Sequence, residues 1–451
     1  MKKAIKLLIL ASACAVLCFG LASCSGEHTT HKPGEVVIEN EIKATCTAKG
    51  SYEEVVYCTV CDEEISRDEI KTDKIPHTPL EPVKENESEP TCVFDGGYDM
   101  VSYCSVCDAT VEKEHTSIQR LAHQYIGEGC SVCNGLKSTK GLKFELNSDK
   151  KGYTLVGIGT CTSTDIVVSL HNDLPVTAIG YHAFENNKTI ETITFGTGNW
   201  ITEIDIAAFS GCSKITEIVL PNSLTDMGIN CFMNCRSLRK VTFGNSLTYI
   251  SSSAFSGCRY LSEIVFSNSI SAIGGSAFER CWSLKRIELP VNAVSIGSGA
   301  FNNCYNLEEV VIKNNIKDIQ ANAFAECRKL KTVTLGSSLK SLFSSTFLNC
   351  TSLGGIIIPD EVERLRAKTF DGCTGLKYIV VGKSVTTIES KTFYNCGTPD
   401  IYYNGTAEDW TKISIGTEND GRGKIYYYSE TEPVDNDGSY WRYVDGVPTV
   451  W

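Results

Sequence analysis

A single cysteine recurs every 23 residues through the C-terminal half of this chain. The nine members of the series are Cys212, Cys235, Cys258, Cys281, Cys304, Cys327, Cys350, Cys373 and Cys396. A phenylalanine stands three residues before each of them, from Phe209 to Phe393, and Phe184 opens this second series with Asn187 in the cysteine position. A 23-residue unit cannot bury an apolar face by itself, so the units must stack on copies of themselves. The sequence therefore predicts a repeat solenoid.

Each unit follows the pattern L-x-x-I-x-L-(P)-x-x-L-x-x-I-G-x-x-A-F-x-x-C. In its first part apolar residues alternate with polar ones, which is typical of a strand with one buried face. One such strand per turn predicts a parallel β-sheet along one side of the solenoid. The rest of the unit predicts short helical or irregular turns on the other side. We expect these repeats to span residues 181–398.

The cysteines of this ladder are expected to be free and buried. Equivalent residues in successive turns lie about 5 Å apart with parallel side chains, whereas a disulfide needs converging Cβ atoms about 3.8 Å apart. A free cysteine behaves as a small apolar residue. The ladder is therefore interpreted as core filling rather than as a redox device.

The repeat resembles the BspA-like leucine-rich repeat family of bacterial surface proteins over about residues 141–430. The lead-in at residues 141–180 is similar to the N-terminal cap of that family, and "IYYNGTAEDWTKISIG" within residues 399–451 to its C-terminal cap. The resemblance implies a curved solenoid on the cell surface, linked to adhesion and without enzymatic activity. The predicted solenoid contains only His171 and His182, and no nucleophile–base motif, phosphate loop or H-E-x-x-H accompanies them.

The N-terminus carries the signals of an exported protein. A basic start and an apolar stretch indicate a signal peptide over residues 1–23. Leu21-Ala22-Ser23-Cys24 resembles the lipobox of bacterial lipoproteins, which implies lipidation at Cys24; an ordinary signal peptide is the alternative. We therefore expect a lipid-anchored protein on the outer face of the membrane, with residues 24–45 as a spacer. The net charge of −12 argues against binding to nucleic acid.

A second repeat of 46 residues precedes the solenoid, in modules expected at residues 46–90 and 91–140. Three cysteines of the first module match three of the second, and histidine follows the same step. Three cysteines and one histidine form the ligand set of a closed, structural zinc site, as in small zinc ribbons; disulfides are the alternative. The predicted ligands are Cys46, Cys58, Cys61, His77, Cys92, Cys104, Cys107 and His123.

The repeat leaves the frame of these ligands open. His31 could serve the first module in place of His77, because all three histidines are 46 residues apart. A truncated third copy adds Cys130 and Cys133 after His123, and it lacks one ligand in either frame.

The predicted sheet offers a surface to a partner. Residues that flank the buried position of each strand point outward, and we expect them to contact an extracellular protein or a glycan on a concave face. They are Glu217, Lys240, Glu263, Arg286, Glu288, Glu309, Thr332, Ile357, Tyr378 and Val380. The alternating charges are also typical of cross-strand pairs on a solvated face.

The aromatic C-terminal region supports an alternative function, carbohydrate binding at the cell surface. Exposed Trp and Tyr rings give sugars apolar contact; the other interpretation is a cap that covers the last repeat. Within this region, Thr406 and Asp409 predict the start of a short helix, and Asp445-Gly446 predicts a hairpin turn.

Overall fold

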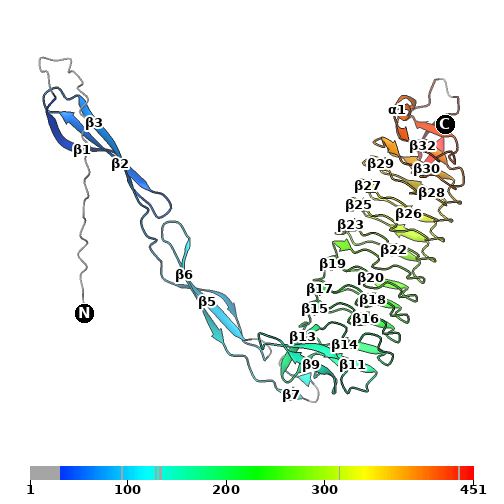
Figure 1. Cartoon of the computed structure of the whole chain (residues 1–451), viewed down its shortest axis with the longest axis horizontal. Helices are drawn as coiled ribbons and strands as arrows, with labels where there is room; N and C mark the ends of the chain where they lie inside the picture. Colours follow the sequence, from blue (N-terminus) through cyan, green and yellow to red (C-terminus); the bar gives the residue numbers. More distant parts are fainter. Residues whose placement is uncertain (1–30, 93–94, 127–128, 132–134, 314, 435–436) are drawn as a thin grey trace. The chain divides into compact units, whose positions relative to one another are not determined.

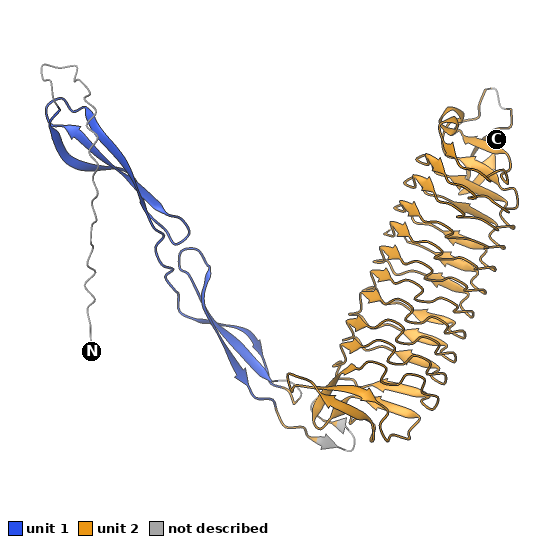
Figure 2. Cartoon of the chain, viewed as in Figure 1, with its two compact units in different colours: residues 1–90, 94–120 blue, residues 91–93, 121–451 orange. Residues whose placement is uncertain are grey.

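The computed structural model describes residues 31–92, 95–126, 129–131, 135–313, 315–434 and 437–451. The expected signal peptide, Cys24 and Cys133 lie outside these residues. The chain divides into two compact units, coloured in Figure 2. Unit 1 comprises Met1–Pro90 and Phe94–Arg120, and unit 2 comprises Thr91–Val93 and Leu121–Trp451.

Unit 1 contains two three-stranded antiparallel sheets, in the orders β1-β2-β3 and β4-β5-β6 (Figure 1). Their strands are β1 (Pro33–Ile42), β2 (Gly50–Cys58), β3 (Glu64–Thr72), β4 (Val83–Ser88), β5 (Gly96–Tyr103) and β6 (Thr110–Ile118). The structure differs here from the expected spacer at residues 24–45, because β1 pairs with β2 along its length. Each module thus begins near its histidine, His31 or His77, rather than at its first cysteine.

The modules of unit 1 have almost no apolar core. Among its described residues, the buried apolar side chains are Val55, Val101, Cys46, Cys58 and Cys104. Three-stranded sheets of this size need an apolar face or another stabilising element to fold independently. Two valines per pair of modules cannot supply it, so the buried cysteines carry a structural role.

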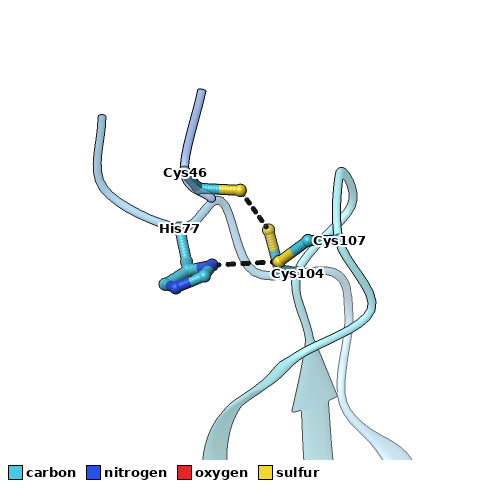
Figure 3. A group of neighbouring side chains, drawn as sticks. All are labelled: Cys46, His77, Cys104 and Cys107. Carbon is cyan, nitrogen blue, oxygen red and sulfur yellow. Dashed lines mark hydrogen bonds between the residues drawn. The ribbon is translucent and has the colours of Figure 1, made fainter. Parts of the chain in front are cut away.

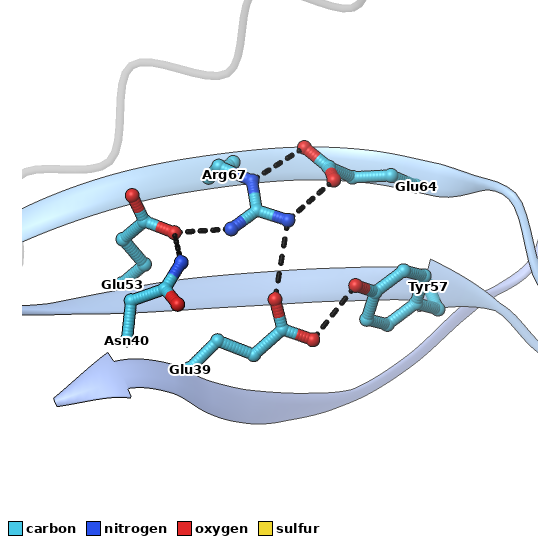
Figure 4. A network of polar contacts seen from close by, with 6 residues as sticks. All are labelled: Glu39, Asn40, Glu53, Tyr57, Glu64 and Arg67. Atoms are coloured by element: carbon cyan, nitrogen blue, oxygen red, sulfur yellow. Dashed lines mark hydrogen bonds and ion pairs between the residues drawn. The ribbon is translucent and has the colours of Figure 1, made fainter.

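A polar network joins the three strands of the first module (Figure 4). Arg67 on β3 forms ion pairs with Glu39 on β1 at 3.2 Å and with Glu53 on β2, and Tyr57 donates a hydrogen bond to Glu39 at 2.8 Å. Because Arg67 reaches all three strands, these contacts fix their register.

The second module repeats this network 46 residues later. Tyr103 donates to Glu85 at 2.9 Å, and Asp99 accepts from Asn86 at 2.9 Å and pairs with Lys113 at 2.9 Å. The bonds from Lys113, Asn86 and His115 hold the pKa of Asp99 well below its usual range. This carboxylate therefore stabilises the module above the ordinary pKa of aspartate, and the stabilisation is lost as the pH falls through the lowered value.

Unit 2 is a β-solenoid, which confirms the predicted fold class, and it has two stacked rows of parallel strands rather than one, each divided into shorter hydrogen-bonded sheets. The expected strands form the first, which we call the long-strand sheet. Its members are β14 (Thr192–Phe195), β16 (Glu217–Val219), β18 (Lys240–Thr242), β20 (Glu263–Val265), β22 (Arg286–Glu288), β24 (Glu309–Val311), β26 (Thr332–Thr334), β28 (Gly355–Ile357), β30 (Tyr378–Val381) and β32 (Asp400–Tyr403).

The second sheet arises from the L-x-x-I segment of each unit, and we call it the short-strand sheet. Its members are β15 (Glu203–Ile204), β17 (Asp226–Met227), β19 (Tyr249–Ile250), β21 (Ala272–Ile273), β23 (Ser295–Ile296), β25 (Asp318–Ile319), β27 (Ser341–Leu342), β29 (Arg364–Leu365), β31 (Thr387–Ile388) and β33 (Ser414–Ile415). The side expected to carry short helical or irregular turns contains these short strands and irregular turns, with no helix in the described repeats. The backbone groups of the A-F segment instead bond to the next turn, as Phe255 N–H does to Ala277 C=O at 2.8 Å.

The repeated phenylalanines form one continuous stack through the core. Ring centroids of successive turns are 5.0–6.1 Å apart, and the ring planes are nearly parallel. Thr346, Thr369 and Thr392 replace alanine beside this stack and are fully buried. Each of their hydroxyls donates to the carbonyl three residues earlier at 2.6–2.7 Å, which satisfies the buried polar group.

The cysteine ladder runs beside the phenylalanine stack, and all nine thiols are free. Each sulfur lies 2.9–3.3 Å from the carbonyl of a phenylalanine in the preceding turn and donates its hydrogen bond there. Eight of the thiols are buried, and Cys396 in the last turn is half-buried. Asn187 takes the same position in the first turn, where its side chain accepts from Thr189 N–H and Ile190 N–H.

We expect the ladder thiols to resist alkylation in the native protein. Burial removes them from the reagent and raises their pKa values, to about 12 for Cys304 and for Cys396, so little thiolate forms. Mass spectrometry after a brief maleimide pulse should find Cys161, which is half-buried outside the ladder, and Cys396 modified before the other eight. Rapid modification of Cys258 or Cys281 without denaturant would contradict this expectation.

The N-terminal cap continues the solenoid with mixed pairing. It contains β9 (Lys143–Leu146), β10 (Tyr153–Gly157), β11 (Asp165–Val168), β12 (Leu170–His171) and β13 (Leu174–Ile179), preceded by the small hairpin of β7 (Tyr125–Ile126) and β8 (Gly129–Cys130). β13 pairs in parallel with β15, and β11 with β14, so both solenoid sheets begin here.

The C-terminal cap contains the predicted helix and hairpin. The helix α1 (Ala407–Thr411) is capped by Thr406, whose hydroxyl accepts from Asp409 N–H at 3.1 Å. The remaining strands are β34 (Ile425–Tyr428), β35 (Tyr440–Val444) and β36 (Val447–Val450). Asp445 and Gly446 join the last two with φ of 51° and 77°, the positive values that a type I′ turn requires. In the described part of the chain, no helix is long and apolar enough to span a membrane.

Candidate metal centres and partner surface

Four predicted ligands of unit 1 converge on one point, which we call the middle centre (Figure 3). Cys46, His77, Cys104 and Cys107 place their ligand atoms within 4.8 Å of one another. Cys46 Sγ is 3.7 Å from Cys104 Sγ, and Cys107 Sγ is 3.3 Å from His77 Nδ1. Cys104 and Cys107 lie in the turn between β5 and β6, and Cys46 lies in the loop between β1 and β2.

These separations fit a tetrahedral zinc ion. Bonds of about 2.3 Å to sulfur and about 2.0 Å to nitrogen place two sulfurs about 3.8 Å apart, and sulfur and nitrogen about 3.5 Å apart. A disulfide would need a sulfur–sulfur distance of about 2.05 Å, and the cysteines of the centre are free thiols. The donor set and its spacing therefore favour a metal over a disulfide.

The protonation behaviour of the middle centre also suits a cation. Hydrogen bonds from backbone N–H groups, first that of Val106, lower the pKa of the Cys104 thiol to about 5. Burial, together with neighbouring Cys107 and Cys104, raises the pKa of Cys46 to about 11. A bound divalent cation would stabilise the Cys46 thiolate, because thiolate is the form that ligates metals.

The ligands of the middle centre come from two consecutive modules. The expectation that one module supplies three cysteines and one histidine is therefore wrong: Cys46 does not join Cys58 and Cys61, but reaches the Cys-x-x-Cys turn of the next module. A sequence spacing of 31 residues from cysteine to histidine holds for Cys46 and His77 and again for Cys92 and His123. This spacing could have indicated that Cys46 and His77 belong to the same centre, although it does not distinguish the two frames by itself.

The N-terminal centre has three predicted ligands. His31, Cys58 and Cys61 converge, with Cys61 Sγ 3.5 Å from His31 Nδ1. The alternative frame, in which His31 serves the first module, matches this arrangement.

The third centre lies in unit 2. Cys92, His123 and Cys130 converge, with the two sulfurs 3.6 Å apart, and Cys92 and Cys130 pack against Leu170 and Trp200. The other ring nitrogen of His123, Nε2, is 3.0 Å from the Asp173 carbonyl. Metal-bound histidines orient their rings with such a second hydrogen bond. Cys92 of the preceding segment thus joins the two predicted ligands of the truncated third copy that the structure describes.

The outward residues of the long-strand sheet lie where the pattern predicts, with one exception. Glu217, Glu263, Arg286, Glu288, Thr332 and Ile357 are exposed, and Lys240, Glu309 and Tyr378 are half-buried. Val380 is only 1 % exposed, so its expected contact with a ligand is excluded in this structure. Its register partner in β32 is Tyr402, whose ring packs edge-on against Trp441 of the C-terminal cap, so the sheet is covered near this end.

The charges of this face compensate one another. Lys240 pairs with Glu263 at 2.8 Å, and Arg286 pairs with Glu309 at 2.9 Å and Glu288 at 3.1 Å. Exposed ion pairs of this kind add little stability, and they leave no strong field to attract a charged ligand. Apolar side chains stand beside them, with exposed fractions of 56 % for Val219, 39 % for Val265 and 40 % for Ile357.

A shallow cavity of about 380 Å³ adjoins the N-terminal turns of this face. Thr194, Val219 and Thr242 of the outward row line it, together with the loops that follow β14, β16 and β18.

The aromatic side chains of the C-terminal region mostly contact one another. Trp441 is fully buried and donates from Nε1 to the Tyr403 carbonyl at 2.9 Å, and Trp410 packs against Tyr403. Tyr428 and Tyr443 remain exposed at its edge. Contacts of this kind are typical of a cap that covers the last turns of a solenoid.

Comparison with known proteins identifies the repeats. The family model of the BspA type leucine rich repeat region matches residues 177–308 and 271–400. No curated protein matches the chain.

Solved structures that resemble the chain include leucine-rich repeat proteins. A leucine rich cell surface protein of Faecalibacterium prausnitzii is 22 % identical, with a TM-score of 0.32, over 61 % of this chain and 96 % of that one. The leucine rich repeat protein of T. pallidum is 26 % identical, with a TM-score of 0.37, over 48 % and 88 %. The pneumococcal vaccine antigen PcpA is 20 % identical, with a TM-score of 0.37, over 64 % and 98 %.

These TM-scores are below 0.5, so the assignment rests on the repeat sequence and on the solenoid that it forms. Through residues 177–400, this chain belongs to the BspA type leucine rich repeat family.

Proposed function

We propose that this protein is a lipid-anchored, non-enzymatic adhesin that binds an extracellular protein through the outward face of its long-strand sheet. The observation that carries the proposal is the composition of that face, in which exposed valines and isoleucine alternate with ion pairs that neutralise one another. Exposed apolar side chains in a row favour contact with another protein surface. Anchoring through Cys24 rests on the lipobox resemblance.

We further propose that unit 1 is a stalk whose modules are held by structural zinc. The middle centre supports this, because its four ligands have zinc-like spacing and come from both modules. A zinc ion there would replace the apolar core that the modules lack and would fix one module against the next. Closed sites of this type are structural and leave no position for catalysis.

The binding face can be tested with two substitutions on the long-strand sheet. In the full-length protein, Val219→Arg combined with Val265→Arg should weaken binding to a protein partner at least about tenfold, because charges at the centre of an interface are desolvated. The partner is first sought among host matrix proteins and the surfaces of neighbouring cells, and its affinity is then measured by surface plasmon resonance.

The matched control is a double variant of the short-strand sheet, Ala272→Arg with Ser295→Arg, which introduces the same two charges. These residues are half-buried on β21 and β23, and binding should be unchanged. Equal binding by both double variants and the wild type would exclude the long-strand face.

The carbohydrate alternative receives less support, because the burial of Trp410 and Trp441 removes two of the rings on which it depends. Binding to a glycan array that is abolished by Tyr428→Ala and Tyr443→Ala, and retained by the sheet variants, would favour it over the adhesin proposal.

A further inference from the structure

Five consecutive turns of the solenoid carry basic and aromatic side chains in the loop between the ladder cysteine and the next strand of the long-strand sheet. These loops are residues 236–239, 259–262, 282–285, 305–308 and 328–331, and they precede β18, β20, β22, β24 and β26. They contain seven basic residues and one acidic residue, Glu308, in a chain whose net charge is −12. We call them the basic loops, because their charge is opposite to that of the whole chain.

Cations and aromatic rings of the basic loops contact one another from turn to turn. The Arg259 guanidinium lies 4.2 Å from the centroid of the Trp282 ring, and that centroid is 5.9 Å from the centroid of Tyr305. Arg328 in turn lies 5.8 Å from the Tyr305 centroid. All four residues directly follow a ladder cysteine, so they form one row along the solenoid. The fold does not require such a row, since turns outside the basic loops have small residues in this position: Ser213, Thr351, Thr374 and Gly397.

Internal packing does not account for these rings. Tyr260 and Tyr305 are 58 % and 37 % exposed. Trp282 is half-buried, and its Nε1 is buried without a hydrogen-bond partner in the described structure. Burial of an unpaired donor lowers stability, so the solenoid gains less from tryptophan here than from an apolar residue. An aromatic row that stays partly exposed at this cost indicates a surface for binding.

Most cations of the basic loops have no acidic partner. Two are paired, Arg328 with Glu326 at 2.9 Å and Lys331 with Glu308 at 2.7 Å. This differs from the neighbouring long-strand sheet, where the charges compensate one another. An uncompensated basic surface attracts anions and raises their local concentration. Within the described part of the chain, five cations of the loops form no ion pair: Arg236, Arg239, Arg259, Lys285 and Lys329.

The chemistry of the basic loops fits an extended acidic polysaccharide. Guanidinium groups bind oxyanions in a bidentate manner, and aromatic rings give sugar rings apolar contact. Successive turns follow one another about every 4.8 Å, so the loops present cations and rings at short, regular intervals. A linear polymer with a repeating anionic group matches such a surface. A folded protein partner is better matched by the apolar side chains of the long-strand sheet.

We infer that the basic loops bind a linear acidic polysaccharide through its sulfate or carboxylate groups, with Tyr260, Trp282 and Tyr305 contacting the sugar rings. This surface lies in the loops rather than on the strands of the proposed protein-binding face, and the inference does not depend on that proposal. The same turns would then carry two binding surfaces, one for a protein and one for an acidic glycan.

The test measures binding of the full-length protein to immobilised polysaccharides by surface plasmon resonance. Heparin supplies sulfate groups, hyaluronan supplies carboxylates alone, and dextran is the neutral control. Heparin or hyaluronan should bind, with an affinity that falls as salt rises because each contact releases counterions. The more tightly bound polymer identifies the preferred anionic group. Binding of both no stronger than that of dextran would overturn the inference.

A pair of matched double variants tests the cations. Lys285→Ser with Lys329→Ser removes two exposed, unpaired lysines, so affinity should fall about tenfold, and the slope of log affinity against log salt should decrease by about one for each lysine. Lys317→Ser with Lys340→Ser removes two exposed lysines that precede β25 and β27 of the short-strand sheet, and it should change neither quantity. Equal losses in the two variants would mean that net charge alone determines binding, and would refute the assignment to the basic loops.

An exposed ring tests the contact with sugar. Tyr260→Ala should lower affinity about fivefold through lost stacking and leave the salt slope unchanged, because the phenol carries no charge. Tyr249→Ala, which removes a ring 45 % exposed on β19, is the control and should have no effect. Polyglutamate represents an acidic protein partner, and it should bind weakly. Polyglutamate bound as tightly as heparin, or heparin affinity unaffected by Tyr260→Ala, would contradict a polysaccharide ligand.

Discussion

Removal of zinc should unfold unit 1 and leave the solenoid intact. Apparent zinc-binding free energies of small structural sites are about 10–16 kcal/mol, whereas the described core of unit 1 contains only two valines and three cysteines. After chelation, peptides from residues 33–118 should exchange their amide hydrogens rapidly, and peptides from residues 181–398 should keep their protection. Added zinc should restore the original pattern.

A substitution in the middle centre should show which part of unit 1 unfolds when that centre loses its metal. Cys104→Ser removes one ligand and should lower the bound zinc by one equivalent, with faster exchange on both sides of the centre because its ligands come from both modules. Ser105→Ala changes an exposed neighbour in the same turn and should have no effect. Unchanged exchange over residues 33–118 in chelated protein would mean that the polar networks alone hold the modules.

Removal of one ring from the phenylalanine stack should give the largest loss of stability in the solenoid. Phe278 is fully buried, its ring lies 5.4 Å from those of Phe255 and Phe301, and Phe266 packs edge-on against it. Phe278→Ala should lower the free energy of unfolding by about 3–5 kcal/mol, through lost burial and the cavity that remains. Guanidinium unfolding followed by circular dichroism measures the shift.

The control for this variant is Phe343→Ala. Phe343 is half-buried outside the stack and contacts the Arg366 guanidinium, so the same deletion should cost clearly less. Because a solenoid is held by contacts between neighbouring turns, the turns before and after Phe278 should also unfold in separate transitions in Phe278→Ala. A midpoint equal to that of Phe343→Ala would contradict a dominant role for the stack.

The fold of unit 2 could be predicted because every turn repeats the same physical requirement. Phenylalanine, alanine and cysteine recur where the turns pack, and even the departures follow the packing, since Asn187 and the buried threonines satisfy their polar groups within the turn. The second sheet could not be predicted. Its strands of two residues are too short to produce a period-two pattern.

The partner surface was predictable only in part. Alternation placed the outward residues of eight strands, but it contains no information about what covers them. Val380 is buried where the aromatic cap covers the end of the sheet, and the charges of Lys240 and Arg286 are neutralised by nearby glutamates. Both effects arise because segments that are distant in sequence meet in the folded chain.

The sequence by itself determined that this chain stacks 23-residue turns, that its ladder cysteines are core residues, and that cysteine and histidine recur every 46 residues in a pattern typical of metal ligands. The tertiary structure decided which of these ligands meet. A 46-residue repeat is unchanged when its frame is shifted by one module, so the spacing is equally compatible with sites inside a module and sites between modules. Only the folded loops, which bring Cys46 to the turn of the next module, distinguish the two, because coordination depends on distance in space rather than along the chain.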